Sequence, residues 1–226
     1  DVGIAYLLKN TFEGIELHAS TQMGLQNIEG VNFVEKLGFS RVVLARELPI
    51  SDIREIHNFN PDIELEAFVH GSMCISYSGR CLLSGHMVGR DANRGMCAQP
   101  CRWNYTIRGY EIEEEKRPDC KMPIEEINGE TFIMASRDTC TIEHIPELVE
   151  AGIDSFKIEG RMKSAEYVRD VTRIWRRLID EHRGATPDEM RELCEIFSRG
   201  GLTDGYFTKN ISRSMLGTRS EGDKQK

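Results

Sequence analysis

Hydrophobic and polar positions along the chain follow two periods in turn, and the pattern predicts alternating strands and helices. Short apolar runs predict strands at 15–21, 41–47, 63–69, 131–135 and 155–160. Apolar residues three to four positions apart predict helices at 1–10, 24–38, 51–60, 142–152, 164–182 and 187–197. Ser51 is expected to cap the third helix, and Ser164 is expected to open the fifth. This alternation is typical of parallel strands joined by crossover helices.

Five predicted strands are too few for a closed (β/α) barrel, which needs eight. We therefore expect an α/β fold, either an open parallel sheet or the C-terminal part of a longer, TIM-like (β/α) barrel that lacks its N-terminal strands. The second is favoured because the chain begins inside a helix. The barrel part is expected at 1–184, with a cysteine-rich insertion at about 72–130. A C-terminal helical segment at 185–217 and a disordered tail at 218–226 are expected to follow.

The composition is that of a globular protein with one substantial core. The formal net charge of −8 argues against bulk affinity for nucleic acid, although a local basic face remains compatible with it. No run approaches the roughly 18 apolar residues that a membrane helix needs, and no signal peptide is evident. We therefore expect a cytoplasmic protein without a membrane partner. Seven cysteines without a secretion signal favour metal-bound thiolates over a disulfide framework.

The stretch 64–103 carries four of the seven cysteines, Cys74, Cys81, Cys97 and Cys101. Their spacing is C-x6-C-x15-C-x3-C, which lacks the C-x2-C pairs of zinc ribbons and fingers. Zinc therefore stays an alternative. An iron–sulfur cluster also takes four thiolates and tolerates looser spacing, so the pattern favours a cluster.

Placement relative to the predicted strands indicates which four thiols converge. Cys74 and Cys140 follow two different strands, so they should meet at one rim of the sheet. Cys81 and Cys97 lie on the loop after the first of these strands, and this loop can fold over a cluster. Cys101 is the rival for the fourth ligand position.

Polar side chains also end the predicted strands, and in parallel α/β folds these ends form the functional face. They provide the candidate site residues His18, Gln22, Arg46, Glu47, Glu66, His70, Lys157, Glu159 and Arg161. The two histidines could instead be hydrogen-bonded structural residues. The Arg46–Glu47 and Glu159–Arg161 pairs could be ordinary ion pairs that hold neighbouring loops. A scaffold alone would not require polar groups at every strand end, so we favour a functional rim.

Residues 66–84 read EAFVHGSMCISYSGRCLLS and resemble the signature of the U-32 family, the collagenase-like peptidases. The resemblance continues through HASTQ at 18–22, RVVLARELP at 41–49, CAQPCRW at 97–103 and SFKIEGRMKS at 155–164. It covers most of the chain. The N-terminal barrel strands of the family are absent, which agrees with the expectation of a partial barrel.

The resemblance implies an oxygen-independent hydroxylase with a 4Fe-4S cluster, because several family members resemble such enzymes. These act on tRNA wobble uridine to give 5-hydroxyuridine, with prephenate implicated, on ribosomal RNA, or on a ubiquinone precursor. By motif, the cluster cysteines fall on Cys74, Cys81 and Cys97, and Cys140 in SRDTC best matches the more variable fourth. The expected partners are tRNA, prephenate as a co-substrate, and a paralogous subunit of the same family.

Three functions compete for this chain. The favoured one is a hydroxylase of the tRNA-modifying type, the alternative is a collagenase-like peptidase, and the third is a cluster-binding scaffold that needs a paralogous partner. The chain contains neither HExxH nor G-x-S-x-G. Cys74 and His70 could form a dyad, but a cysteine that shares a loop with three others is better explained as a ligand. An anionic small molecule could be held by the cations Arg46, Arg137, Lys157 and Arg161.

The predicted helix at 164–182 carries four arginines opposite its apolar face. They are Arg169, Arg173, Arg176 and Arg177. They could contact RNA phosphates, or they could form a solvated face paired with Glu166, Asp170 and Asp180. The sequence leaves both readings open.

Overall fold

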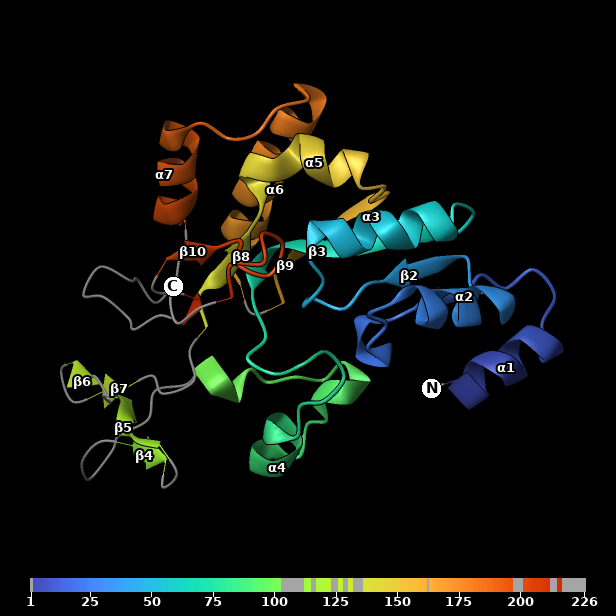
Figure 1. The fold of residues 1–226 in the computed structure, drawn as a ribbon, viewed down its shortest axis with the longest axis horizontal. Coiled ribbons are helices and arrows are strands. Elements are labelled where there is room, and N and C mark those ends of the chain that lie inside the picture. The colour runs from blue at the N-terminus through green and yellow to red at the C-terminus, as the bar shows by residue number, and fades with distance from the viewer. Residues whose placement is uncertain are drawn as a thin grey trace.

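The computed structural model describes residues 2–102, 136–161, 163–196, 201–211 and 215–216, together with the backbone of four short strands between 112 and 131. Its centre is a six-stranded sheet in the order β1-β2-β3-β8-β10, with β9 paired to β3 (Figure 1). The strands are β1 (His18–Ala19), β2 (Arg41–Val43), β3 (Glu64–Ser72), β8 (Asp138–Cys140), β9 (Ser155–Glu159) and β10 (Leu202–Thr203). The α-helices are α1 (Val2–Thr11), α2 (Ile28–Lys36), α3 (Ile50–Phe59), α4 (Leu83–Val88), α5 (Ile145–Glu150), α6 (Ala165–Asp180) and α7 (Pro187–Ile196).

Most neighbouring strands are parallel, which confirms the predicted α/β class. The parallel pairs are β1–β2, β2–β3, β3–β9 and β8–β10. No described pairing joins β1 to β10, so this part of the chain does not by itself close a ring of strands. The barrel therefore remains a prediction.

Strand β8 runs antiparallel to β3, so the prediction of uniformly parallel strands is wrong at this position. Gly71 of β3 pairs with Thr139 on one edge and Glu159 on the other, which places β8 and β9 on opposite edges. Near its start, at Glu66, β3 pairs with β2 and β9 instead. β8 therefore occupies the part of the β3 edge that the short strand β2 leaves free. The strand predicted at 131–135 lies almost wholly outside the described residues.

The predicted helices are present, with one correction at a helix start. Ser164 caps α6 as expected, since its hydroxyl accepts a hydrogen bond from the backbone N–H of Tyr167 at 3.2 Å. Ser51 does not cap α3, because that helix begins one residue earlier and Pro49 occupies the cap position. The Ser51 hydroxyl donates to the Asp52 carboxylate at 2.7 Å instead.

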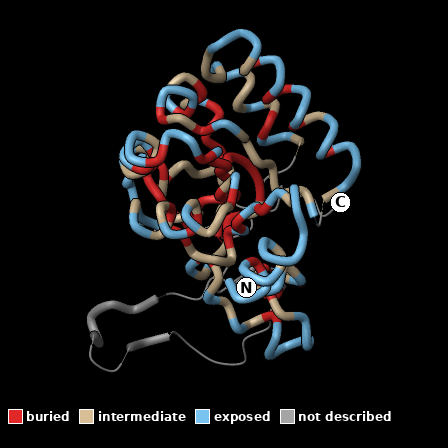
Figure 2. The backbone as a smooth tube through the Cα atoms, turned by 90° about the vertical axis from the view of Figure 1, so that its right-hand side faces the viewer, coloured by how far each residue is buried: buried red, intermediate tan, exposed pale blue. Residues whose placement is uncertain are grey.

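The apolar face of α6 forms much of the core. Val171, Ile174, Trp175 and Leu178 are almost fully buried, and they pack in one cluster with Leu65 and Val69 of β3. Figure 2 shows the buried residues gathered at the centre of the fold, with exposed residues on the outer turns of the helices. This burial explains why the strongest helical periodicity in the sequence lies in α6.

The arginine face of α6 is paired with carboxylates. Arg169 binds Asp170 at 2.8 Å, and Arg176 binds Asp180. Arg173 and Arg177 reach across to α7, where they bind Glu192 at 3.2 Å and Glu189 at 2.8 Å. The four arginines thus form the solvated, paired face that was one of the two readings of the sequence.

The C-terminal segment is only partly helical. α7 confirms the helix predicted at 187–197 as far as Ile196, but β10 follows it and joins the main sheet beside β8. The expected tail at 218–226 lies outside the described residues. Between 112 and 131, β4 (Ile112–Glu114) pairs with β5 (Arg117–Met122), and β6 (Glu126–Ile127) pairs with β7 (Glu130–Thr131), both antiparallel. In the part of the chain that is described, no helix is long and apolar enough to span a membrane.

Candidate functional site

A cavity of about 240 Å³ lies between the strand ends of the sheet and the cysteine loop, by which we mean residues 73–102. Polar residues from the strand ends that line it are Gln22, Arg46, Lys157, Glu159 and Arg161. From the loop side it is lined by Cys74, Cys81, Cys97 and Cys101. Five of the nine predicted rim residues therefore meet four thiols around one space.

Ser78 ties the first half of the cysteine loop to the end of β2. Its buried hydroxyl accepts hydrogen bonds from the backbone N–H of Arg46 at 3.2 Å and from the Arg46 guanidinium at 3.3 Å. The backbone N–H of Ser78 donates to the Glu47 carboxylate. Arg46 and Glu47 thus hold the loop rather than each other, and Arg46 still lines the cavity.

A buried ion network ties both ends of the loop to the sheet. Arg102 binds Asp138 of β8 at 2.6 Å and donates to the backbone carbonyl of Met73 at 2.8 Å. Lys163 binds the other oxygen of Asp138 at 3.3 Å. The side chains of Arg102, Asp138 and Lys163 are only 2%, 2% and 5% exposed. Because Met73 and Arg102 adjoin Cys74 and Cys101, the network fixes the positions of two thiols.

Sequence reasoning missed Arg102 and Lys163. Neither residue carried a signal of its own, since each is one basic residue in a chain that has 29. Arg102 lies 36 positions and Lys163 lies 25 positions from Asp138 in the sequence, and only the tertiary fold brings the three residues together.

The four loop thiols lie close enough to affect one another. Burial raises the pKa of the Cys101 thiol to about 11, and the neighbouring Cys74, Cys97 and Cys81 add to this effect while Arg102 opposes it. Burial likewise raises the pKa of Cys74, with smaller contributions in the same direction from Cys81 and Cys97. Four thiols that line one cavity fit a group that several thiolates bind together.

Hydrogen bonds also position Cys81 and Cys97, the other two cysteines that line the cavity. Cys81 exchanges two bonds with the Asn93 side chain, its N–H donating at 3.1 Å and its carbonyl accepting at 2.9 Å. The Cys97 sulfur accepts from the backbone N–H of Gln99 at 3.3 Å. Within the described residues, no three His, Cys, Asp or Glu side chains lie close enough together to hold a single metal ion.

Cys140 does not join the other thiols, contrary to the expectation that it meets Cys74 at the rim. It is a buried residue of β8 and does not line the cavity. Burial raises its pKa to about 12, and the groups that add to this are Cys194, Glu143 and Asp204. Because β8 is antiparallel to β3, Asp138 lies at the rim opposite Ser72, while Cys140 lies two residues deeper, opposite His70.

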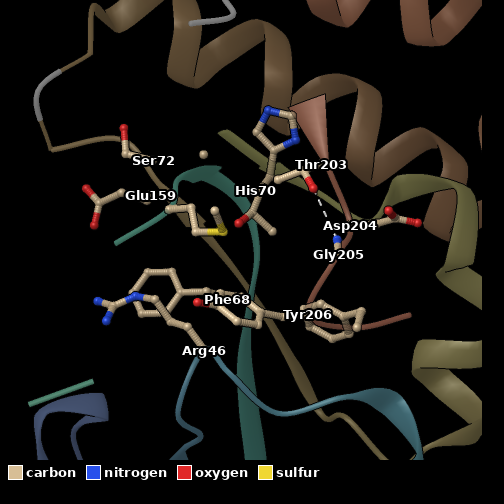
Figure 3. A pocket seen from close by; sticks show the side chains of 13 residues that line it. Arg46, Phe68, His70, Ser72, Glu159, Thr203, Asp204, Gly205 and Tyr206 are labelled. Carbon is tan, nitrogen blue, oxygen red and sulfur yellow. Dashed lines mark hydrogen bonds between the residues drawn. The ribbon is translucent and has the colours of Figure 1, made fainter. Parts of the chain in front are cut away.

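His70 is a core residue rather than the base of a cysteine dyad. Its ring lies 6.2 Å from that of Tyr167 and 6.1 Å from that of Trp175, and burial lowers its pKa to about 4. It lines a small adjoining cavity of about 10 Å³ (Figure 3), which shares Arg46, Phe68 and Glu159 with the cavity of the four thiols, whereas His70 itself does not line the latter. Its Nδ1 has no hydrogen-bond partner among the described groups. His70 therefore does not face the thiol cavity, and its burial disfavours the protonated ring that it would become as the base for Cys74.

Two further predicted residues also lie off the cavity. Glu66 is nearly buried and binds Lys157 at 2.5 Å and Arg41 at 3.4 Å, so it orients cations at the strand ends. His18 is partly exposed, lies 3.9 Å from Glu16 and lines a neighbouring groove. In contrast, the guanidinium carbon of Arg46 lies 4.8 Å from the centre of the Phe68 ring, and the Nζ of Lys157 lies 5.3 Å from the same point. Both cations therefore stay at the cavity wall.

The sequence matches peptidase family U32 over residues 1–216. The chain belongs to this family. The tRNA hydroxylation protein P1 of Bacillus subtilis is 46% identical over 177 residues, which cover 74% of this chain and 38% of that protein. The 23S rRNA 5-hydroxycytidine C2501 synthase of Escherichia coli is 35% identical, covering 95% of this chain and 30% of that protein. A collagenase of Porphyromonas gingivalis is 35% identical, and the match covers 86% of this chain and 48% of that protein.

The U32 chain thus spans half or less of the length of these three relatives, whose names cover two RNA hydroxylations and one proteolysis. No solved structure matches it. The resemblance noted in the sequence is confirmed at the level of the family. The choice between the activities that these names describe depends on the site.

Gly79 allows the cysteine loop of this U32 chain to dock, which gives a first prediction. Its φ is +73°, and a Cβ there would lie 2.1 Å from the carbonyl oxygen of Gln22. Gly79→Ala is expected to lift the loop and cost about 1–3 kcal/mol of stability. The measurement is thermal unfolding together with limited trypsin digestion, read as faster cleavage after Arg80.

The matched control is Gly85→Ala in the same loop. A Cβ on Gly85 meets no atom within 4 Å, and this residue lies in α4, where alanine is the better helix former. Gly85→Ala should therefore leave digestion unchanged. Equal digestion rates in the two variants would show that the contact of Gly79 with Gln22 does not hold the loop.

Proposed function

We propose that this chain provides the cluster-binding and substrate-facing part of an iron–sulfur-dependent hydroxylase that modifies tRNA. The observation that carries the proposal is the meeting of four cysteines and three cations, Arg46, Lys157 and Arg161, around one cavity. Relatives named for tRNA hydroxylation support tRNA as the substrate. A relative named for 23S rRNA 5-hydroxycytidine supports hydroxylation of an RNA base as the type of reaction.

The proposed cofactor is a 4Fe-4S cluster held by Cys74, Cys81, Cys97 and Cys101. Iron–sulfur clusters are bound by cysteine thiolates, and these four line one space while Cys140 does not. Cys101 thus replaces Cys140 as the proposed fourth ligand. Zinc is the alternative cofactor and has less support, because among the described residues no three His, Cys, Asp or Glu side chains lie close enough together to hold a single ion.

Hydroxylation of a base replaces C–H by C–OH; with water as the source of oxygen, two electrons and two protons leave the substrate, so the reaction needs an external two-electron acceptor. A bound cluster would supply one-electron redox chemistry beside the base. The residues of the chain itself have binding roles in this proposal. Arg46, Lys157 and Arg161 bind the carboxylates of an anionic co-substrate, for which we propose prephenate, and hold it against the wall formed by Phe68.

The proposed site of modification is C5 of the wobble uridine, giving 5-hydroxyuridine. Mass spectrometry of tRNA from a strain that lacks the gene and its paralogues should show loss of the hydroxylated uridine, with recovery when the full-length gene is restored. Arg161→Met should recover about a tenth as much as the wild type, because a charged contact to the co-substrate is lost. Arg176→Met, on the outer face of α6, is the matched control and should recover fully.

Two outcomes would contradict this assignment. Wobble-uridine hydroxylation that persists without the gene and its paralogues would exclude tRNA as the substrate. Loss of a hydroxylated base from ribosomal RNA alone would move the proposal to rRNA.

The peptidase alternative has less support from the site. It needs a nucleophile beside a base, and the one histidine near Cys74 in the sequence is neutral, buried and on another cavity. The scaffold alternative, in which a paralogous subunit provides the activity, differs in its prediction. The purified chain would then bind a cluster, yet restoring its gene without the paralogue would not recover hydroxylation.

A further inference from the structure

The cysteine loop is basic in an acidic protein. Residues 73–102 contain four arginines and one acidic residue, Asp91, which is a local net charge of +3 in a chain with a net charge of −8. The loop projects from the sheet with α4 at its far side (Figure 1). A local charge of this sign next to the candidate site is complementary to a polyanion.

Three of these arginines are exposed and have no anionic partner in the described part of the chain. Arg80, Arg90 and Arg94 are all exposed, and none forms an ion pair with a described carboxylate. Arg90 donates only to the backbone carbonyl of Met96, at 3.0 Å. The arginines of α6 differ in this respect, since each is bound to an aspartate or a glutamate. The loop arginines therefore keep their full charge for a ligand.

An exposed aromatic ring lies at the mouth of the cavity. Tyr77 is 67% exposed, although it also lines the cavity that holds the four thiols. Leu82 and Met96 of the same loop are exposed as well. An exposed ring beside unpaired arginines is the arrangement with which proteins bind single-stranded nucleic acid, because the ring stacks on a base and the cations contact phosphates.

A groove of about 400 Å³ continues from the cavity mouth. The cavity and the groove share the lining residues Ser20, Gln22, Asn93 and Gly95. Arg94 lines the groove but not the cavity. A strand whose base enters the cavity would therefore have a continuous path past Arg94. This continuity connects the basic loop to the site rather than leaving it as a separate surface.

We propose that the cysteine loop is a binding surface for single-stranded RNA, on which Tyr77 stacks against a base at the cavity mouth and Arg80, Arg90 and Arg94 contact phosphates. The proposal rests on the proposed function for the class of ligand and adds the surface that binds it. An unpaired loop of tRNA presents splayed bases of the kind that aromatic side chains stack on.

The first test measures binding of bulk tRNA to the full-length protein by fluorescence anisotropy over a salt series. The variant Arg80→Gln/Arg90→Gln/Arg94→Gln should bind at least about 10-fold more weakly than the wild type at low salt. Its plot of log affinity against log salt should be shallower by about 2, because close to one counterion is released per phosphate contact. The control Arg169→Gln/Arg173→Gln/Arg176→Gln removes the same charge from α6 and should stay within about twofold of the wild type.

The second test isolates the ring. Tyr77→Ala should weaken binding of a fluorescent oligouridine by about 10-fold, because one base loses its stacking partner. Tyr77→Phe keeps the ring and should bind within about twofold of the wild type. Iron content and circular dichroism equal to those of the wild type show that each variant is folded.

Equal losses in the two arginine variants would overturn the proposal, because they would show a response to net charge alone. Unchanged binding in the loop variant would also overturn it. A wild-type protein that binds no RNA would remove this proposal and the proposed function together. Loop-dependent binding of tRNA combined with intact hydroxylation in the deletion strain would support the surface and contradict the proposed function, so the two failures are distinguishable.

Discussion

Asp138→Ala is expected to destabilise the full-length protein by about 3–5 kcal/mol. The carboxylate of Asp138 binds both Arg102 and Lys163, and all three side chains are almost fully buried. Removal of this one anion takes a shared carboxylate away from two buried cations. The measurement is urea unfolding, in which the transition midpoint should fall.

The matched control is Asp188→Ala. Asp188 also binds an arginine, Arg191, but its side chain is 82% exposed, so this pair should contribute between 0 and about 1 kcal/mol. A similar shift of the midpoint in the two variants would show that Asp138 does not hold a buried network. Asp138→Asn keeps the size of the side chain without the charge and should give an intermediate loss.

Cys101→Ala is expected to remove most of the bound iron, whereas Cys140→Ala should keep it. The first change deletes a thiol that lines the cavity beside Cys74, Cys81 and Cys97. The second deletes a sulfur that is buried within β8, away from those thiols, and should cost only about 1 kcal/mol of core packing. The measurements are the iron and acid-labile sulfide bound per chain, and the visible absorption spectrum of anaerobically purified protein.

This pair of variants separates the two candidates for the fourth ligand. Iron lost from Cys140→Ala but retained by Cys101→Ala would restore Cys140 to the ligand set. A colourless wild-type protein that contains zinc, with no change in iron on Cys74→Ala, would contradict the cluster altogether. Neither readout depends on the hydroxylation reaction, so both test the metal site alone.

The sequence placed residues correctly around the cavity where the strands that carry them are parallel to β3. Arg46 follows β2 and Lys157 lies in β9; both strands are parallel to β3, and both residues line the same cavity. The expectation that Cys140 lies at the rim was wrong because it assumed the same direction for β8. A reversed strand brings its first residue to the rim and takes its last residue into the core.

The two histidines show a second limit of the sequence. His70 directly follows the strand predicted at 63–69, and His18 lies in the strand predicted at 15–21. The sequence pattern alone does not distinguish either histidine from a catalytic group. His70 is packed against Trp175 and Tyr167, which lie about 100 residues further along the chain. Its lowered pKa comes from those long-range contacts, since burial disfavours the protonated ring more than the nearby Asp138 favours it.

The sequence by itself determined the α/β class, the core face and cap of α6, the cysteine loop and the membership in family U32. These features depend on local periodicity and on residue identities within short stretches. Only the tertiary structure decided the direction of β8, the placement of Cys101 at the cavity and of Cys140 in the core, the pairing of Arg102 with Asp138, and the pairing of the α6 arginines with carboxylates. Each of these depends on contacts between distant segments, whose free energy has no counterpart in the spacing of residues along the chain.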